Sequence, residues 1–356
     1  MLLCAVLLGC GACANGVPLR SLQPDRLIQW SSPKSDGVAW VKNIEDSRDA
    51  GISRGLWKRV ADFVFGESDT SIVKPYGVLM DDQDHLYVVD VALKLVHVMD
   101  TRDNSYRVIG RKSQERLLTP IALAVDGGGN LYISDSEAGA VYRYNLASGA
   151  FTLFAGDLQR PTGLAWHPQK KQLYVSETAA HRIVVFDQNG QTRRRIGRRG
   201  EGSGEFNFPT DLLFDAQGAL YVTDSLNDRI QKLTAEGKFI SRLGVQGDGP
   251  GEFLKPKGIA VDSRGALYVC DALRDSVQVF EPSGQFRLEF GERGQGAGKF
   301  WMPSGIFIDR EDVIYVSDTY NRRIQLFKRV GPRRQAEEET GAGPGQGTAG
   351  KPEVSR

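Results

Sequence analysis

The chain has 356 residues, of which 25% are charged and 40% hydrophobic, and its formal net charge is +1. A charge balance this close to zero excludes a global electrostatic attraction to nucleic acid or to an anionic membrane. The length alone would suit two or three ordinary domains.

The N-terminal segment, residues 1–16, reads as an export signal. An apolar run over residues 1–8 leads to Gly9-Cys10 and is too short to span a bilayer as a helix, which takes about 20 apolar residues. Leu7-Leu8-Gly9-Cys10 resembles the end of a bacterial lipoprotein signal, in which the cysteine is lipidated. The resemblance implies a protein of the cell envelope anchored in a membrane through Cys10. Because Gly11 is not the Asp of inner-membrane retention, the outer membrane is expected if the source is Gram-negative; a plain secretion signal is the alternative.

Residues 17–65 form an N-terminal extension. Ser53 reads as an N-cap and Gly66 as a C-cap, and four apolar residues between them have helical spacing, so a helix is predicted over residues 53–65. At the other end, residues 331–356 are rich in Gly, Pro, Glu and Gln. This tail has almost no large apolar side chains and is expected to be disordered.

Residues 66–330 contain six repeats of one pattern. Each repeat has a segment that begins with proline, followed by a segment that contains tyrosine and ends with an acidic residue. The prolines, from Pro75 to Pro303, are 45, 41, 48, 47 and 47 residues apart. A period in the forties with several short β-patterns per unit is typical of a β-propeller. The array is therefore expected to form one domain whose units pack on each other.

Each repeat divides into four short strands. In the fifth, strands are predicted over residues 258–262, 267–271, 277–280 and 286–290, with Gly265 in the first hairpin turn. Six such units predict an all-β fold, a six-bladed β-propeller of four-stranded antiparallel blades.

The sixth blade lacks an outer strand of its own. Only three residues separate Phe327 from Gly331, where the tail begins. An unpaired edge would be a site for aggregation, so an N-terminal strand is expected to close the ring. With residues 53–65 read as a helix, the closing strand is predicted near residues 27–30 or 38–44.

Three loops that follow outer strands share a glycine spacing: residues 197–206, 244–253 and 291–300. A phosphate-binding cradle would need a helix directly after such a loop, and here another strand follows. The loops are therefore read as structural turns, and the phenylalanine that ends each is predicted to fill the space between neighbouring blades.

The segment from Asp318 to Phe327 resembles the NHL-repeat signature, as does the segment from Asp224 to Gln231. The resemblance covers residues 66–328 and implies a binding platform. It also leaves alternatives, because some related six-bladed propellers are enzymes. The amidating lyases hold zinc through histidines, and the lactonase-like hydrolases hold calcium in the central channel. Some animal NHL propellers bind RNA.

An acid ends the second strand of every repeat. Because the position repeats, these residues are read as turn acids that accept backbone N–H bonds, not as a catalytic ring. Arg229 and Arg323 are placed to pair with two of them. The six acids are Asp90, Asp135, Glu177, Asp224, Asp271 and Asp318.

Asp211 is the outlier among possible ligands, since it stands where four other repeats have glycine, at the start of the innermost strand. It is a weak candidate for a calcium ligand, because the other repeats offer no partner oxygens there. The four histidines fall at four different blade positions, which disfavours a zinc site; they are His85, His97, His167 and His181. Cys270 is read as a small buried apolar residue.

The motifs therefore favour a non-catalytic propeller that binds a protein or peptide, is monomeric and needs no cofactor. A calcium- or zinc-dependent hydrolase or lyase with its site in the channel is one alternative. An RNA-binding propeller that uses the arginines at positions 193–195 is the other, although these alternate between two faces of a strand and no nucleic acid partner is expected.

Overall fold

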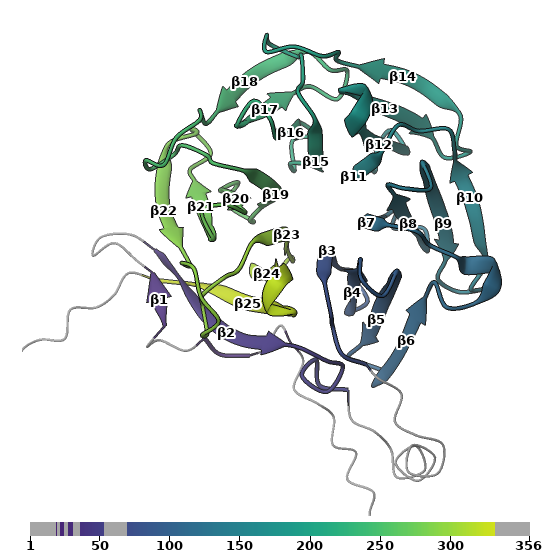
Figure 1. The fold of residues 1–356 in the computed structure, drawn as a ribbon, viewed down its shortest axis with the longest axis horizontal. Helices are drawn as coiled ribbons and strands as arrows, with labels where there is room; N and C mark the ends of the chain where they lie inside the picture. Colours follow the sequence, from purple (N-terminus) through teal and green to yellow (C-terminus); the bar gives the residue numbers. More distant parts are fainter. Residues whose placement is uncertain (1–18, 20–21, 25–27, 31–35, 53–69, 332–356) are drawn as a thin grey trace, which may run out of the picture.

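The structure of the protein is a computed structural model, and it describes residues 19, 22–24, 28–30, 36–52 and 70–331. Six twisted antiparallel sheets surround a central axis, as Figure 1 shows. This confirms the predicted all-β fold, the six blades and their four-stranded design. The described residues contain no helix long and apolar enough to cross a membrane. The predicted helix over residues 53–65, Cys10 and the tail from residue 332 lie outside the described residues.

The blades follow one another along the chain, each running from the axis outward. Blade 1 contains β3 (Pro75–Met80), β4 (His85–Asp90), β5 (Leu95–Asp100) and β6 (Ser105–Ile109). Blade 2 contains β7 (Pro120–Val125), β8 (Asn130–Asp135), β9 (Ala140–Asn145) and β10 (Phe151–Ala155). Blade 3 contains β11 (Pro161–His167), β12 (Gln172–Glu177), β13 (Arg182–Asp187) and β14 (Thr192–Ile196).

The second half repeats this arrangement. Blade 4 contains β15 (Pro209–Phe214), β16 (Leu220–Asp224), β17 (Arg229–Leu233) and β18 (Phe239–Leu243). Blade 5 contains β19 (Pro256–Val261), β20 (Leu267–Asp271), β21 (Ser276–Phe280) and β22 (Phe286–Phe290). Three short 3-10 turns lie in the loops: η2 (Ser113–Glu115), η3 (Thr178–Ala180) and η4 (Thr319–Asn321).

Blade 6 is completed from the other end of the chain. Its own strands are β23 (Pro303–Ile308), β24 (Val313–Asp318) and β25 (Arg323–Val330), and β2 (Gly37–Ile44) pairs antiparallel with β25. The short strand β1 (Gln29–Trp30) then pairs with β2. The prediction of an N-terminal closing strand is confirmed. Of the two segments, residues 38–44 fill the place of the outer strand and residues 29–30 add a fifth strand beyond it.

The core lies between blades rather than within them. Each tyrosine of the second strands is buried, and so is the phenylalanine that ends each glycine loop. Phe206 packs between blades 3 and 4, Phe253 between blades 4 and 5, and Phe300 between blades 5 and 6. The predicted role of these phenylalanines is confirmed, because each joins a cluster formed by two neighbouring sheets.

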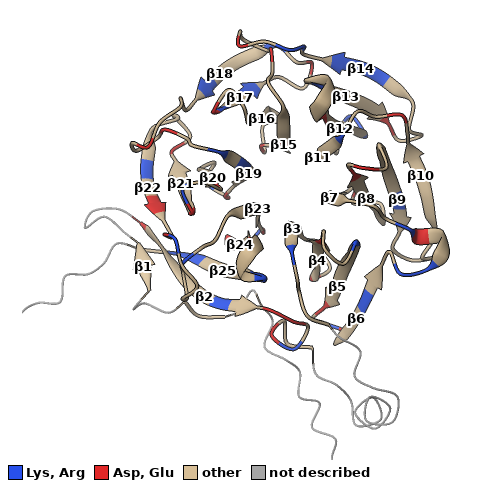
Figure 2. Cartoon of the chain, in the orientation of Figure 1, with Lys and Arg blue, Asp and Glu red and all other residues tan. Residues whose placement is uncertain are grey.

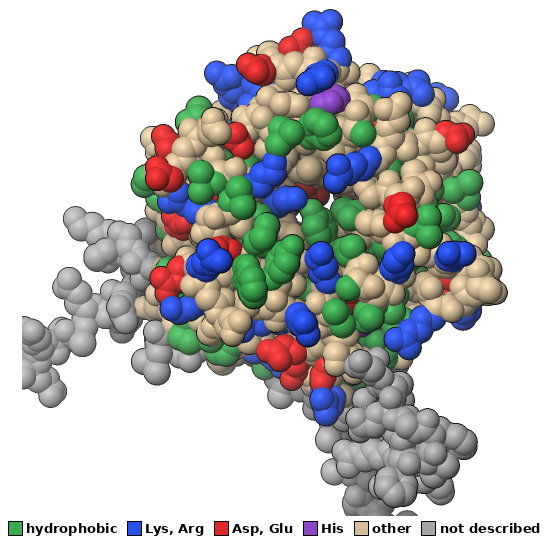
Figure 3. Space-filling model, viewed as in Figure 1, with side chains coloured by type: hydrophobic (Ala, Val, Ile, Leu, Met, Phe, Trp, Pro, Cys, Tyr) green, Lys and Arg blue, Asp and Glu red, His purple; other side chains and the backbone are tan. Residues whose placement is uncertain are grey.

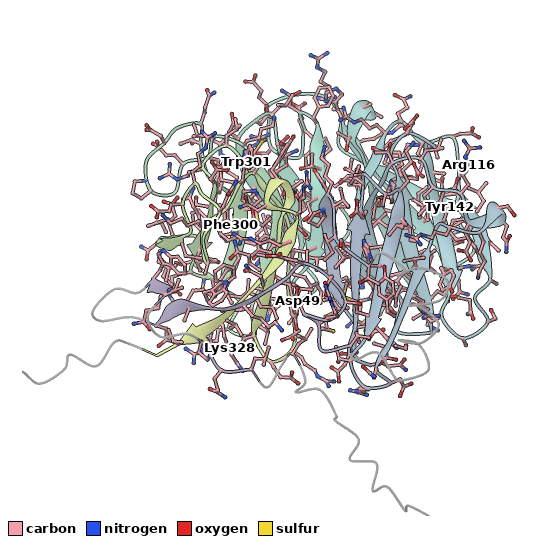
Figure 4. All side chains as sticks on the ribbon, turned by 60° about the horizontal axis from the view of Figure 1, so that its bottom comes forward. Asp49, Arg116, Tyr142, Phe300, Trp301 and Lys328 are labelled. Atoms are coloured by element: carbon pink, nitrogen blue, oxygen red, sulfur yellow. The ribbon has the colours of Figure 1, made fainter. Side chains whose placement is uncertain are left out.

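The ring has two faces with different connections. The upper face, turned toward the reader in Figure 1, carries the loops from each outer strand to the next inner strand and the loops between second and third strands. The lower face carries the tight hairpin turns. Figure 4 shows Trp301 and Arg116 toward the upper face and Lys328 toward the lower face.

Candidate functional site

A bulge in every inner strand shapes the channel. In blade 1, Pro75 pairs with Asp90, and pairing resumes only at Val78 opposite Val88, so Tyr76 and Gly77 are left unpaired. The same shift follows the first proline of the other five inner strands. A bulge releases residues from the sheet plane, and here the released pairs line the axis near the upper face.

At these bulges the inner strands of neighbouring blades approach closely. A Cβ atom added at Gly305 would lie 2.1 Å from the carbonyl oxygen of Tyr76, and one added at Gly163 would lie 2.5 Å from that of Thr210. Only glycine allows such an approach of two backbones. The repeated glycine of the sequence is therefore a packing residue of the channel wall.

Asp211 breaks this pattern, and its carboxyl group bridges blades 4 and 5. Its Oδ2 accepts a hydrogen bond from the backbone N–H of Ile259 at 3.0 Å, and its Oδ1 accepts one from Leu212 at 3.0 Å. Burial raises the pKa of Asp211 to about 6, and the two N–H donors oppose that rise. The group thus replaces the direct backbone contact that glycine permits elsewhere in the ring.

Asp211 borders two cavities on the axis. The upper one, of about 70 Å³, is enclosed by the bulged residues and contains Tyr76 and Lys257 in its wall. The lower one, of about 310 Å³, is lined almost wholly by apolar residues of the inner strands, among them Trp166, Phe214 and Phe307. The carboxyl group therefore lies where the two spaces meet.

The six turn acids hold loops of the upper face. Each accepts backbone N–H bonds from the loop that precedes its own inner strand, for example Leu118 to Asp135 at 2.6 Å and Leu254 to Asp271 at 2.7 Å. Arg229 donates to Asp224 at 2.8 Å, and Arg323 donates to Asp318 at 2.8 Å. The remaining acids are bound in the same way: Asp90 by Val73 and Leu93, and Glu177 by Gln159.

The four histidines occupy separate surroundings. His85 lies between Asp81 and Asp100, at 2.7 and 3.1 Å, and the hydrogen bond to Asp81 raises the pKa of His85. His97 contacts the hydroxyl of Tyr106 at 2.8 Å, and His181 accepts a bond from the N–H of Phe208. Among the residues that the structure describes, no three His, Cys, Asp or Glu side chains are grouped so as to hold a metal ion.

Cys270 and the three arginines at positions 193–195 were also considered as site residues. Cys270 is a free, fully buried thiol whose pKa is raised by burial. The arginines at positions 193–195 lie on the outer strand β14, at the rim of the ring in Figure 2.

The upper face gathers exposed apolar side chains that the sequence reasoning did not single out. Trp301 is 38% and Tyr320 46% exposed, and their rings lie 5.5 Å apart. Corresponding loops of blades 5, 4 and 1 expose further large apolar residues: Leu254, Leu273, Leu226 and Leu93. Figure 3 shows hydrophobic side chains of this face interspersed with Lys and Arg around the central opening. The sequence offered one indication of these exposed apolar residues, which is their position. Each lies a few residues from the first proline of an inner strand or from a turn acid, at a position whose residue type differs between repeats.

Cations stand beside these side chains. Three precede the first proline of an inner strand, Lys74, Arg160 and Lys255, and Lys257 follows one. The Lys74 ammonium lies 5.4 Å from the ring centre of Tyr320, and that of Lys257 lies 5.8 Å from the ring centre of Tyr76. Within the described ranges none of the four makes an ion pair with a carboxylate. Burial and then the neighbouring Lys257 lower the pKa of Lys255.

Comparison with known proteins agrees on the class of fold. The profile of the SMP-30/Gluconolactonase/LRE-like region matches residues 124–243, and a profile described as a 6-bladed beta-propeller matches residues 263–330. Both matches support the same statement: this is a six-bladed β-propeller protein. Neither covers half of the chain, so they define its architecture and not its chemistry.

Solved structures show the same fold at low identity. A streptogramin B lyase has a TM-score of 0.56 and 13% identity, covering 72% of this chain and 94% of that chain. A catalytically inactive virginiamycin B lyase from Staphylococcus aureus has a TM-score of 0.53 and 16% identity, covering 72% of this chain and 94% of that chain. An auxiliary nutrient binding protein from Bacteroides thetaiotaomicron has a TM-score of 0.59 and 16% identity, covering 74% of this chain and 71% of that chain.

Proposed function

We propose that this protein is a non-catalytic NHL-type propeller that binds a protein or peptide on its upper face. The observation that supports the proposal best is the apolar surface over blades 4, 5 and 6 around Trp301 and Tyr320. Large apolar side chains that are exposed together on one face are typical of an interaction site. Tryptophan and tyrosine are among the residues that contribute most to binding energy at protein interfaces.

The charges of this face define the partner further. Lys74, Lys255 and Lys257 have no carboxylate partner among the described residues, and two of them lie beside exposed or half-buried tyrosines. A partner that brings carboxylates would pair with them and gain a faster association as well as specificity. The proposed partner is therefore a segment that combines apolar and acidic side chains.

The test is capture of partners from an envelope extract of the source organism by the purified protein. Trp301→Ser/Tyr320→Ser should lose the captured partner, because it removes the apolar surface. Leu153→Ser/Phe239→Ser, which alters exposed residues on the outer strands β10 and β18, is the matched control and should retain it. Capture that is equal for both double variants would contradict the proposal, as would the absence of any partner at saturating protein.

A second pair of double variants tests the role of the lysines on the upper face. Lys255→Glu/Lys257→Glu should weaken capture at low salt. Lys171→Glu/Lys238→Glu places the same change in exposed hairpin turns of the lower face and should leave capture unchanged. If both pairs weaken capture equally, the attraction is a property of the whole surface and not of the upper face.

Anchoring through Cys10 belongs to the same proposal, and it is supported by the resemblance of residues 7–10 to a lipoprotein signal. Metabolic labelling with palmitate should mark the full-length protein and not the Cys10→Ser variant. A wild-type protein that stays unlabelled and is released in soluble form would favour the plain secretion signal.

A metal-dependent hydrolase or lyase is the second candidate, favoured by one observation: the matched SMP-30/Gluconolactonase/LRE-like region includes Asp211. The residues present do not fit a resident metal well, because both oxygens of Asp211 accept backbone N–H bonds and the described residues offer no further carboxylate or imidazole beside it. Elemental analysis of the purified protein decides: near-stoichiometric calcium or zinc that is lost in Asp211→Asn would revive this candidate.

A further inference from the structure

The lower cavity plays no part in the proposed binding of a partner on the upper face. It is an apolar space of about 310 Å³ with one carboxyl group at its inner end. Pockets that bind small molecules are mostly apolar, hold a few polar groups that fix orientation and begin at about this volume.

The walls of this cavity are ordered by contacts behind them. Phe214 packs against His167 at 4.7 Å and against Tyr174 at 4.8 Å between ring centres, and Trp166 stacks on Tyr132 at 5.7 Å. Aromatic rings held in this way present fixed faces to the space between the inner strands. Such faces attract both apolar groups and cations.

Asp211 at the inner end has no counter-charge. Its two hydrogen bonds come from neutral backbone N–H groups, and within the described part of the chain no Lys, Arg or His forms an ion pair with it. A half-buried carboxylate without a cation carries a cost in free energy. A ligand that supplies the cation would remove this cost. The equivalent positions of the other inner strands are glycine or Ala122, so Asp211 is the one carboxylate among the described residues that line the two cavities, and Lys257 lines only the upper cavity.

We propose that the lower cavity binds a small apolar molecule that carries one primary ammonium group. The ammonium pairs with Asp211, and the apolar part lies among Trp166, Phe214 and Phe307. This site is distinct from the apolar surface of the upper face, since Trp301 and Tyr320 border neither cavity.

The experiment uses 2-phenylethylamine as the probe and 2-phenylethanol, of the same shape without the charge, as its matched control. Binding to the whole protein is measured by saturation-transfer difference NMR with titration at neutral pH. The amine should bind saturably and at least tenfold more tightly than the alcohol. Equal affinity of the two compounds, or no saturable binding of the amine, would overturn the proposal without the need for any variant.

Variants then locate the site. Asp211→Asn should lower the affinity for the amine at least tenfold, because the charged contact is lost. The affinity for the alcohol should stay within about twofold of the wild-type value. Lys238→Met, in an exposed hairpin turn that borders neither cavity, should change neither affinity. If the amine binds Asp211→Asn as tightly as the wild type, it binds elsewhere and the proposal fails, whereas loss of partner capture by the upper-face variants bears on the proposed function alone.

Discussion

Arg323 and Asp318 form a buried ion pair in which the guanidinium Nε donates to the carboxylate Oδ2 at 2.8 Å. The same guanidinium donates to the carbonyl oxygens of Gly296 and Lys299 in the preceding glycine loop, at 2.8 and 2.9 Å. One side chain therefore joins the end of β24 to the loop that carries Phe300. Blade 4 repeats the arrangement with Arg229, Asp224 and the loop before Phe206.

Because this pair is buried, its loss should be costly. Arg323→Ala removes the cation that pairs with the Asp318 carboxylate, which then keeps, among the described residues, only neutral donors from Trp301, Asn321 and Gln325, and we expect the free energy of unfolding to fall by about 3 to 5 kcal/mol. Arg198→Ala removes an ion pair with Glu205 in which the arginine is 83% exposed, and its effect on stability should be much smaller because water screens the pair. Urea unfolding of both variants measures the difference, and equal losses would contradict the structural role given to the buried pair.

The close approach of inner strands predicts a sharp effect at Gly305. An added methyl group would meet the backbone oxygen of Tyr76, which cannot move without shifting blade 1. Gly305→Ala should therefore lower the midpoint of thermal unfolding by several degrees, as expected of overpacking by about 1 to 3 kcal/mol. Gly331→Ala is the control, because a Cβ there meets nothing within 4 Å. A thermal midpoint of Gly305→Ala equal to that of the control would argue against a close-packed channel wall.

Asp211 should make stability depend on pH. Its folded pKa is raised to about 6, so the folded state holds a proton that the unfolded state has lost, and stability falls as pH rises from about 4 through about 6. The loss from this group amounts to about 3 kcal/mol, at 1.36 kcal/mol for each pKa unit. We therefore expect the free energy of unfolding of Asp211→Asn, measured with urea at pH 4.5 and about pH 7.5, to decrease less between the two pH values than that of the wild type. The control variant Asp82→Asn, at a side chain that is 91% exposed, should show the same decrease in stability with rising pH as the wild type.

The closing strand should be needed for a soluble ring. A truncated protein that begins at Glu45 lacks β1 and β2, which exposes the edge of β25 with Phe327 and Leu326 behind it. Unpaired strand edges recruit other chains, so we expect aggregation or oligomers in size-exclusion chromatography. Adding a synthetic peptide of residues 28–44 should restore part of the monomer. A truncated protein that remains monomeric and equally stable would contradict closure by β2.

The repeat made the architecture predictable, because a period of forty-odd residues and four β-patterns per unit leave few other folds. The N-terminal closure followed from counting outer strands before Gly331. The sequence also placed Asp211 at the channel. The bulge after each proline could not be predicted, and neither could the backbone N–H groups of Leu212 and Ile259 that bind Asp211, because they show in no sequence pattern. The cluster around Trp301 and Tyr320 was also missed, because these positions vary from blade to blade and become neighbours only on the assembled face.

The most direct test of the account is hydrogen–deuterium exchange of the protein with and without its captured partner. Binding on the upper face should slow exchange in the upper-face loops of blades 5 and 6 and leave the outer strands β10 and β18 unchanged. These loops are residues 253–257, 272–275, 300–304 and 319–322. Protection confined to the outer strands or to the lower hairpin turns would contradict binding by the upper face.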